Sequence, residues 1–221
     1  MTEGQVGAIE FLARQYDYGR GASHARKVAD LSTSLFDQLA DSGLLESAGS
    51  DARRTLYAAA IVHDIGSSLQ ARHDAGLPTT PTSVSSLENT GFVSYQLVKA
   101  LLDNPTAPLV QSRVDARDRS ALLHAVLWSD AGHQFETNDE PVVAATYTRT
   151  LAGILSLARG LDCRLSSQVS GLQVVKAEHW VRVLVRSMSS VEQEVSEANA
   201  HVKPLEQVLG TRVFVQEIIE E

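Results

Sequence analysis

The stretch from Tyr57 to Gly66 constrains the fold of this 221-residue chain most strongly. Residues Tyr57 to Val62 are apolar all round, which predicts a helix buried on most sides. His63 and Asp64 follow side by side, and Gly66 is a residue that readily ends helices. A buried histidine and aspartate are costly unless each finds a hydrogen bond or a metal. A capped helix end with a satisfied histidine is the ordinary interpretation, and a site requires other ligand-type residues to converge there.

A second histidine lies on the apolar face of an earlier predicted helix. Ser23 is a candidate N-cap, and the helix is expected to run to about Asp41. Its apolar stripe recurs at helical spacing through His24, Val28, Leu31, Leu35 and Leu39. A lone histidine in such a stripe is more often a core residue than a ligand. His24 is therefore a candidate ligand only in combination with His63 and Asp64.

Further helices are expected over 4–16, 51–62, 89–102, from Asp118 or Ser120 onward, and from Pro141 to near Asp162. Asp130 shares a stripe with Leu123 and Leu127, so its carboxylate is predicted to point inward. Residues 76–86 are rich in Pro, Thr and Ser and predict a long surface loop, with Arg72 and His73 exposed at its start.

The C-terminal part changes character. Residues 172–176 and 180–186 alternate as strands and predict a hairpin. Residues 189–209 have helical spacing that Pro204 must kink or divide, and 212–218 alternate as a final strand. The predicted fold class is mostly α: a helical bundle over 1–166, followed over 167–221 by a small appendage with a β-β-α-β antiparallel sheet.

Composition excludes several classes of protein. Hydrophobic residues make up 43% of the chain, too many for a disordered protein, and the net charge of −8 argues against nucleic acid as the main partner. The single cysteine cannot form an intrachain disulfide, and no signal peptide or apolar run of about 20 residues is visible. We expect a soluble cytoplasmic protein that binds neither nucleic acid nor membrane.

Three motifs carry a family resemblance: Ser23-His-Ala-Arg-Lys-Val-Ala29, Val62-His-Asp-Ile-Gly66 and Leu155-Ser-Leu-Ala-Arg-Gly-Leu-Asp162. Together they resemble the H…HD…D pattern of the HD superfamily of metal-dependent phosphohydrolases. The order of elements is similar to the C-terminal HD-like domain of the exopolyphosphatase and guanosine-pentaphosphatase (Ppx/GppA) family, over nearly the whole chain. The resemblance implies an HD-type bundle. Members of that family also carry an actin-like N-terminal half with the polyphosphate-hydrolysing residues, which this sequence lacks.

The sequence departs from the family pattern at the metal site. The resemblance implies metal ligands at His24, His63 and Asp64, with Asp64 catalytic only when metal is bound. Arg159 stands where the family has its final aspartate, and the family's frequent histidines at the positions of Val93 and Asp130 are lost. A divalent ion about 4 Å from a guanidinium meets roughly 8 kcal/mol of repulsion at an effective dielectric of about 20. We therefore expect no metal, with Arg159 in a bidentate pair with Asp64.

Three functions remain open. The leading one is a stand-alone Ppx/GppA-type HD domain with a degraded metal site. It would bind a protein partner or, through Arg159, His24 and His63, a phosphate-rich ligand: polyphosphate, guanosine polyphosphate or nucleotide. The alternative is an active phosphohydrolase on such a compound, with one divalent metal held by Asp162 or Asp130 as replacement ligand. If Asp162 is not a metal ligand, it is expected to be an ordinary helix-end residue. The third is an assembly module, a homodimer paired through the edges of the tail sheet.

Overall fold

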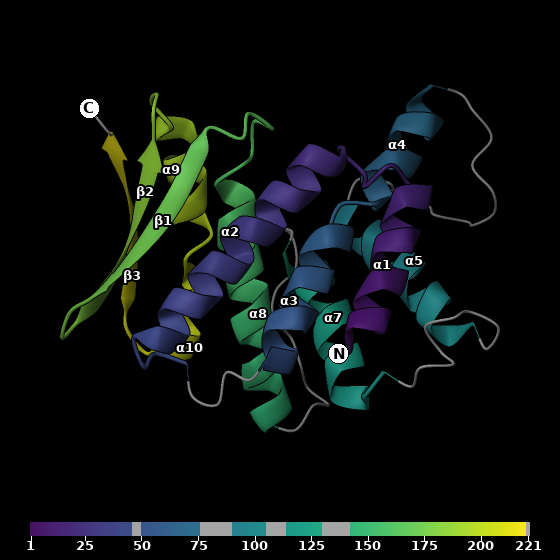
Figure 1. The fold of residues 1–221 in the computed structure, drawn as a ribbon, viewed down its shortest axis with the longest axis horizontal. Helices are drawn as coiled ribbons and strands as arrows, with labels where there is room; N and C mark the ends of the chain where they lie inside the picture. Colours follow the sequence, from purple (N-terminus) through teal and green to yellow (C-terminus); the bar gives the residue numbers. More distant parts are fainter. Residues whose placement is uncertain (46–49, 76–89, 105–113, 130–141, 220–221) are drawn as a thin grey trace.

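The computed structural model describes residues 1–45, 50–75, 90–104, 114–129 and 142–219. The chain is mostly helical with a small mixed sheet at its C-terminal end, which confirms the coarse fold class (Figure 1). The elements are α1 Glu3–Gln15, α2 Ala22–Asp41, α3 Ser50–Val62, α4 Gly66–Asp74, α5 Thr90–Asp103, α7 Ala116–Trp128, α8 Val142–Gly160, β1 Val169–Lys176, β2 Trp180–Ser187, α9 Glu192–Ala200, α10 Lys203–Leu209 and β3 Arg212–Ile219.

Helix α3 lies at the centre of the helical part. It contacts α1, α2, α7 and α8, as the apolar run from Tyr57 to Val62 predicts. The run of small side chains at Ala58, Ala59 and Ala60 is fully buried and lets neighbouring helices approach closely. Because α3 is enclosed in this way, the two residues that follow it, His63 and Asp64, are also buried.

Two local predictions in this region are wrong. Ser23 is not the N-cap of α2, because the helix begins at Ala22 and its N-cap is Gly21. Gly66 does not end the helical run but begins α4, which includes Arg72 and His73 instead of leaving them in a loop. A Cβ at Gly66 would lie 2.6 Å from the carbonyl oxygen of Thr90, so the glycine is required by the close approach of α5.

The sheet is mixed, and the predicted antiparallel sheet is wrong in this respect. Strands β1 and β2 form an antiparallel hairpin, but β3 pairs parallel to β2. The reason is the connection: α9 and α10 carry the chain back along the sheet, so β3 runs in the same direction as β2. Pro204 lies in the first turn of α10 and divides the helical segment, as predicted.

Side-chain amides cover both edges of this sheet. Gln38 of α2 donates to the carbonyl of Leu172 at 3.0 Å and accepts from the amide of Val174 at 2.8 Å on β1. On β3, Asn199 of α9 makes the equivalent pair of bonds with the backbone of Val215, at 2.9 and 3.0 Å. These bonds occupy backbone groups that would otherwise be available to another strand.

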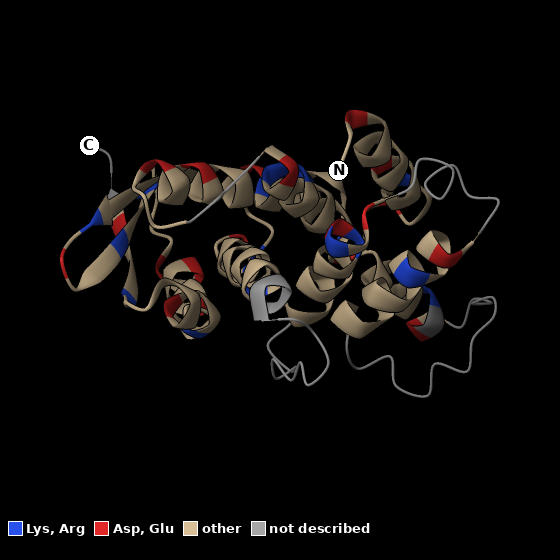
Figure 2. Cartoon of the chain, turned by 90° about the horizontal axis from the view of Figure 1, so that it is seen from below, with Lys and Arg blue, Asp and Glu red and all other residues tan. Residues whose placement is uncertain are grey.

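The helical part and the appendage share contacts. Helix α8 contacts both α9 and α10, and α2 contacts β1. The predicted boundary at 166/167 falls in the segment between α8 and β1. Figure 2 shows Lys and Arg interspersed with Asp and Glu along the described helices. Among the described residues, the helices are all too short or too polar to cross a membrane.

Candidate functional site

The structure brings His24, His63 and Asp64 together in the interior. His24 comes from the first turn of α2, and the other two come from the turn between α3 and α4. Their side chains are at most 2% exposed, and one ligand-type atom of each lies within 4.8 Å of the others. The two imidazole rings are 5.3 Å apart between centroids. The predicted convergence of these three residues is therefore present.

Hydrogen bonds fix the orientation of both imidazoles. His24 Nδ1 lies 2.8 Å from Asp162 Oδ2, and His63 Nδ1 lies 2.7 Å from the carbonyl oxygen of Ala60. Both partners accept, so each Nδ1 donates its hydrogen to them. Neither Nε2 nor Asp64 Oδ1 has a hydrogen-bond partner among the described residues. Buried polar groups of three residues thus lie close together, an arrangement that favours a cation or a strong donor.

Near pH 7 His63 is neutral and Asp64 is ionised. Burial lowers the pKa of His63 to about 3, only partly offset by the neighbouring Asp64 carboxylate, so the imidazole carries no charge near pH 7. Burial would raise the pKa of Asp64, but the His63 imidazole, which is protonated at the low pH where Asp64 titrates, and the guanidinium groups of Arg159 and Arg20 outweigh it and lower that pKa to about 2. Asp64 is therefore an anion in the protein interior, and it needs cationic partners.

Two arginines supply those partners. Arg159 Nη2 lies 3.8 Å from Asp64 Oδ1, while its Nη1 donates to the carbonyl oxygen of Ser129 at 2.9 Å. The predicted pairing of Arg159 with Asp64 is present, but at 3.8 Å through one nitrogen it is not the bidentate contact that was expected. Arg20 makes the closer ion pair, through Nε to Asp64 Oδ2. Sequence reasoning missed Arg20.

The turn between α1 and α2 positions Arg20. It lies between Gly19 and Gly21, whose φ angles of +77° and +105° are in the region that favours glycine. Gly19 also lies directly against the backbone of Asp64, with no room for a side chain. Close approach of the turn to Asp64 thus sets the position from which the Arg20 guanidinium reaches the carboxylate. A Gly-Arg-Gly sequence beside the helix that carries His24 was the available signal.

Asp162 and Asp130 were predicted as possible replacement ligands for a metal, and the structure describes only Asp162. Asp162 Oδ2 is engaged by His24, and its Oδ1 accepts from the backbone amide of Ser167 at 2.8 Å. Both oxygens therefore have partners, and Asp162 orients His24 from behind. Asp130 lies outside the described residues, so the inward position of its carboxylate stays a prediction.

A small pocket opens on the other side of the two arginines. Its volume is about 150 Å³. Residues of the α1–α2 turn, of α8 and α9, and of the segments that directly follow α7, α8 and α9 line it: Arg20, Ser129, Ser156, Arg159, Gly160, Cys163, Glu197 and His201. Arg20 and Arg159 line this pocket and also pair with buried Asp64. The same two guanidinium groups therefore interact with Asp64 of the His24–His63–Asp64 cluster and with whatever occupies the pocket.

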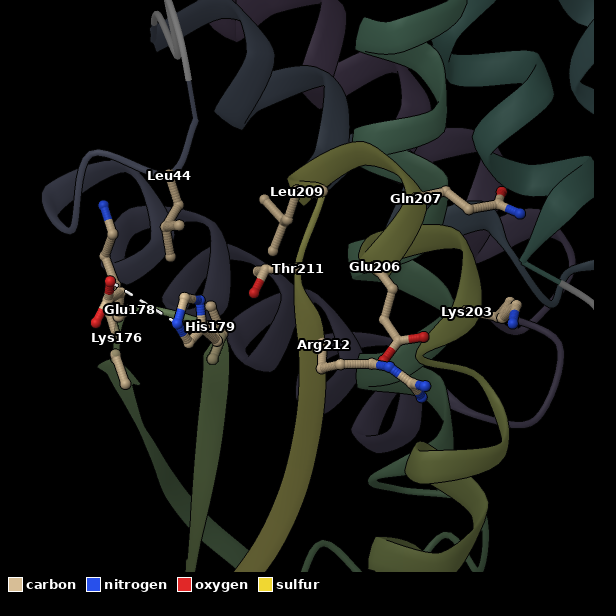
Figure 3. Close-up of a pocket in the computed structure, with 13 residues that line it drawn as sticks. Leu44, Lys176, Glu178, His179, Lys203, Glu206, Gln207, Leu209, Thr211 and Arg212 are labelled. Atoms are coloured by element: carbon tan, nitrogen blue, oxygen red, sulfur yellow. Dashed lines mark ion pairs between the residues drawn. The ribbon is translucent and has the colours of Figure 1, made fainter.

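A larger cavity of about 620 Å³ lies elsewhere, between the end of α2, the β1–β2 hairpin and α10 (Figure 3). Its lining mixes cations and carboxylates, and Glu178 pairs with His179 at 3.8 Å within it. It shares no lining residue with the smaller pocket and does not include His24, His63 or Asp64. The smaller pocket is thus the candidate site.

Comparison with known proteins adds no family assignment. Neither a scan against models of protein families nor a search of curated proteins gave a match to this chain.

Proposed function

We propose that this chain binds the phosphate group of a small molecule through Arg20 and Arg159, and that it does so without a metal. The observation that carries the proposal is the meeting of two guanidinium groups, from the α1–α2 turn and from α8, at one pocket and one carboxylate. Both guanidinium groups line the pocket as well as pairing with Asp64, so they are placed to contact a ligand there. Guanidinium groups bind phosphate oxygens in pairs with charge-assisted hydrogen bonds.

Electrostatics favours an anion over a divalent cation at this place. A doubly charged ion about 4 Å from one guanidinium would be repelled by roughly 8 kcal/mol at an effective dielectric of about 20, and two guanidiniums lie here. Asp64 is already paired with both of them. A phosphate in the pocket would instead be attracted by both side chains. Asp64 then acts as the buried anchor that holds the arginines in place.

A second function is favoured by one specific observation. His24, His63 and Asp64 each offer a ligand-type atom within 4.8 Å of the others, and a carboxylate and a carbonyl group hold the two Nδ1 atoms, as in protein metal sites. These three residues would hold a divalent metal, which when bound would lower the pKa of a water for attack on a phosphoester. Arg20 and Arg159 would then orient the substrate phosphate. In this alternative a metal would compete with both arginines for the Asp64 carboxylate.

Thermal-shift measurements with orthophosphate test the leading proposal. We expect stabilisation of the wild-type protein that survives treatment with chelator. Arg159→Gln and Arg20→Gln should each weaken orthophosphate binding about 10- to 100-fold, since a hydrogen bond to a charged group contributes about 1.5–3 kcal/mol. Arg53→Gln is the matched control, because Arg53 loses the same charge but pairs with Asp37 at the surface.

Metal analysis separates the two candidates. Protein purified without chelator should contain far less than one equivalent of transition metal. Near-stoichiometric metal that His63→Ala removes would reject the metal-free proposal and support the phosphohydrolase.

A further inference from the structure

The pocket has an anionic side as well as a cationic one. Helix α9, from the C-terminal appendage, contributes Glu197 and His201, while Arg20 and Arg159 lie on the helical bundle. The Glu197 side chain is 50% exposed, and its Oε1 lies 3.1 Å from His201 Nε2. The His201 imidazole donates this hydrogen bond, and the Glu197 carboxylate accepts it. One small cavity therefore carries two cations and one carboxylate.

The size of the cavity limits the ligand. A volume of about 150 Å³ equals roughly five waters at about 30 Å³ each. This is room for one phosphate and a few further heavy atoms. A nucleotide or a polyphosphate chain would have to extend outside the pocket, where Arg20 and Arg159 could contact only its terminal group.

The charge of Glu197 limits the ligand further. A second phosphate group next to this carboxylate would be repelled, whereas an ammonium group would be attracted, in each case by up to about 4 kcal/mol at about 4 Å and an effective dielectric of about 20. Solvent screening at this half-exposed side chain reduces both effects but not their signs. Glu197 therefore selects against pyrophosphate-type ligands and for a cationic neighbour of the phosphate.

We propose that the pocket binds a small zwitterionic phosphomonoester, the phosphate ester of an amino alcohol or hydroxy amino acid, with phosphate on Arg20 and Arg159 and ammonium on Glu197. This proposal rests on the proposed phosphate-binding function and narrows it. It replaces the polyphosphate and nucleotide ligands that the family resemblance implied with a much smaller class.

Calorimetric titration at pH 8 tests the proposal with three probes. Phosphoethanolamine carries both groups, ethyl phosphate lacks the ammonium, and pyrophosphate adds a second phosphate. We expect phosphoethanolamine to bind about tenfold or more tightly than ethyl phosphate, and pyrophosphate to bind most weakly. Glu197→Gln should equalise phosphoethanolamine and ethyl phosphate, while Glu192→Gln, an exposed change on the same helix, should keep the preference.

The outcomes distinguish this inference from the function on which it rests. Equal affinities for phosphoethanolamine and ethyl phosphate in the wild-type protein, or tighter binding of pyrophosphate, would overturn the zwitterion proposal and leave phosphate binding intact. Failure of all three probes to bind would reject the phosphate-binding function itself. The comparison of ligands on the wild-type protein does not depend on how any variant folds.

Discussion

At the scale of single residues, the burial of His63 determines how the protein responds to acid. Its pKa in the folded protein is about 3, below the ordinary value of 6.5, because the surrounding core disfavours the charged imidazole. The unfolded chain takes up a proton at this histidine below about pH 6.5, whereas the folded chain does so only near pH 3. Acid therefore favours the unfolded state across that interval.

We predict that His63 lowers the free energy of unfolding as the pH falls from about 6.5 towards 3, by up to about 1.4 kcal/mol per pH unit. Asp64, with its pKa lowered to about 2, contributes stability that is lost only below about pH 4, so the interval from 4 to 6.5 reports His63. Urea denaturation at pH 7, 6, 5 and 4 measures the effect. His63→Gln, which cannot titrate, should show a shallower dependence, and identical slopes for both proteins would contradict the assignment.

Apolar helical patterns predicted that His24, His63 and Asp64 are buried, and the resemblance to the HD pattern implied that the three residues meet. Arg159 was placed near Asp64 by its position in the third motif. Arg20 could not be placed in the same way, since it lies in an irregular turn whose path depends on positive φ angles and on the contact of Gly19 with Asp64. The small pocket also escaped prediction, because its lining joins α9 to the bundle across a long sequence separation.

At the scale of elements, the α1–α2 turn is the part on which the site depends most. We predict that Gly19→Ala lowers the free energy of unfolding by about 1–3 kcal/mol, because a Cβ would clash with the Asp64 backbone and the φ of +77° is unfavourable for alanine. It should also weaken orthophosphate binding, since the turn positions Arg20. Urea denaturation and calorimetry measure the two effects.

Gly7→Ala is the matched control for this change. Gly7 lies inside α1, and a Cβ there would contact nothing within 4 Å. Alanine should raise helix stability by up to about 1 kcal/mol and leave binding unchanged. Equal effects of Gly19→Ala and Gly7→Ala on the free energy of unfolding and on orthophosphate binding would show that the turn does not position Arg20.

The positions of the other described helices followed from hydrophobic periodicity, whereas α4, several helix ends and the strand direction did not. The end of α3 and the start of α4 depend on how closely α5 approaches Gly66, which is a tertiary contact. The direction of β3 depends on the path of α9 and α10 across the sheet. Alternation is typical of antiparallel strands with one solvated face, so the alternating pattern of β3 gave no sign that it pairs parallel to β2.

At the scale of the whole molecule, the covered sheet edges bear on assembly. Gln38 and Asn199 occupy backbone groups of β1 and β3 that a homodimer paired through these edges would need. This arrangement disfavours edge-to-edge assembly, and it agrees better with a ligand-binding protein whose sheet supports α9 at the pocket. We therefore do not favour a homodimer paired through these edges.

We predict that Asn199→Ala lowers the free energy of unfolding by about 1–3 kcal/mol, because the amide and carbonyl of Val215 lose their partners. It should also increase self-association at high protein concentration, since the β3 edge becomes available to another strand. Sedimentation velocity measures the association. Gln193→Ala, an exposed change on α9, is the control, and a variant as monomeric and as stable as that control would contradict the role of Asn199.

The central claim is that Arg20 and Arg159 bind phosphate without a metal, and calorimetric titration of orthophosphate into chelator-treated protein tests it most directly. The account predicts saturable binding that weakens as salt is added, is reduced about 10- to 100-fold by Arg159→Gln, and does not increase when a divalent transition metal is restored. Binding that occurs only after the metal is restored, or that is the same in the wild type and Arg159→Gln, would contradict it.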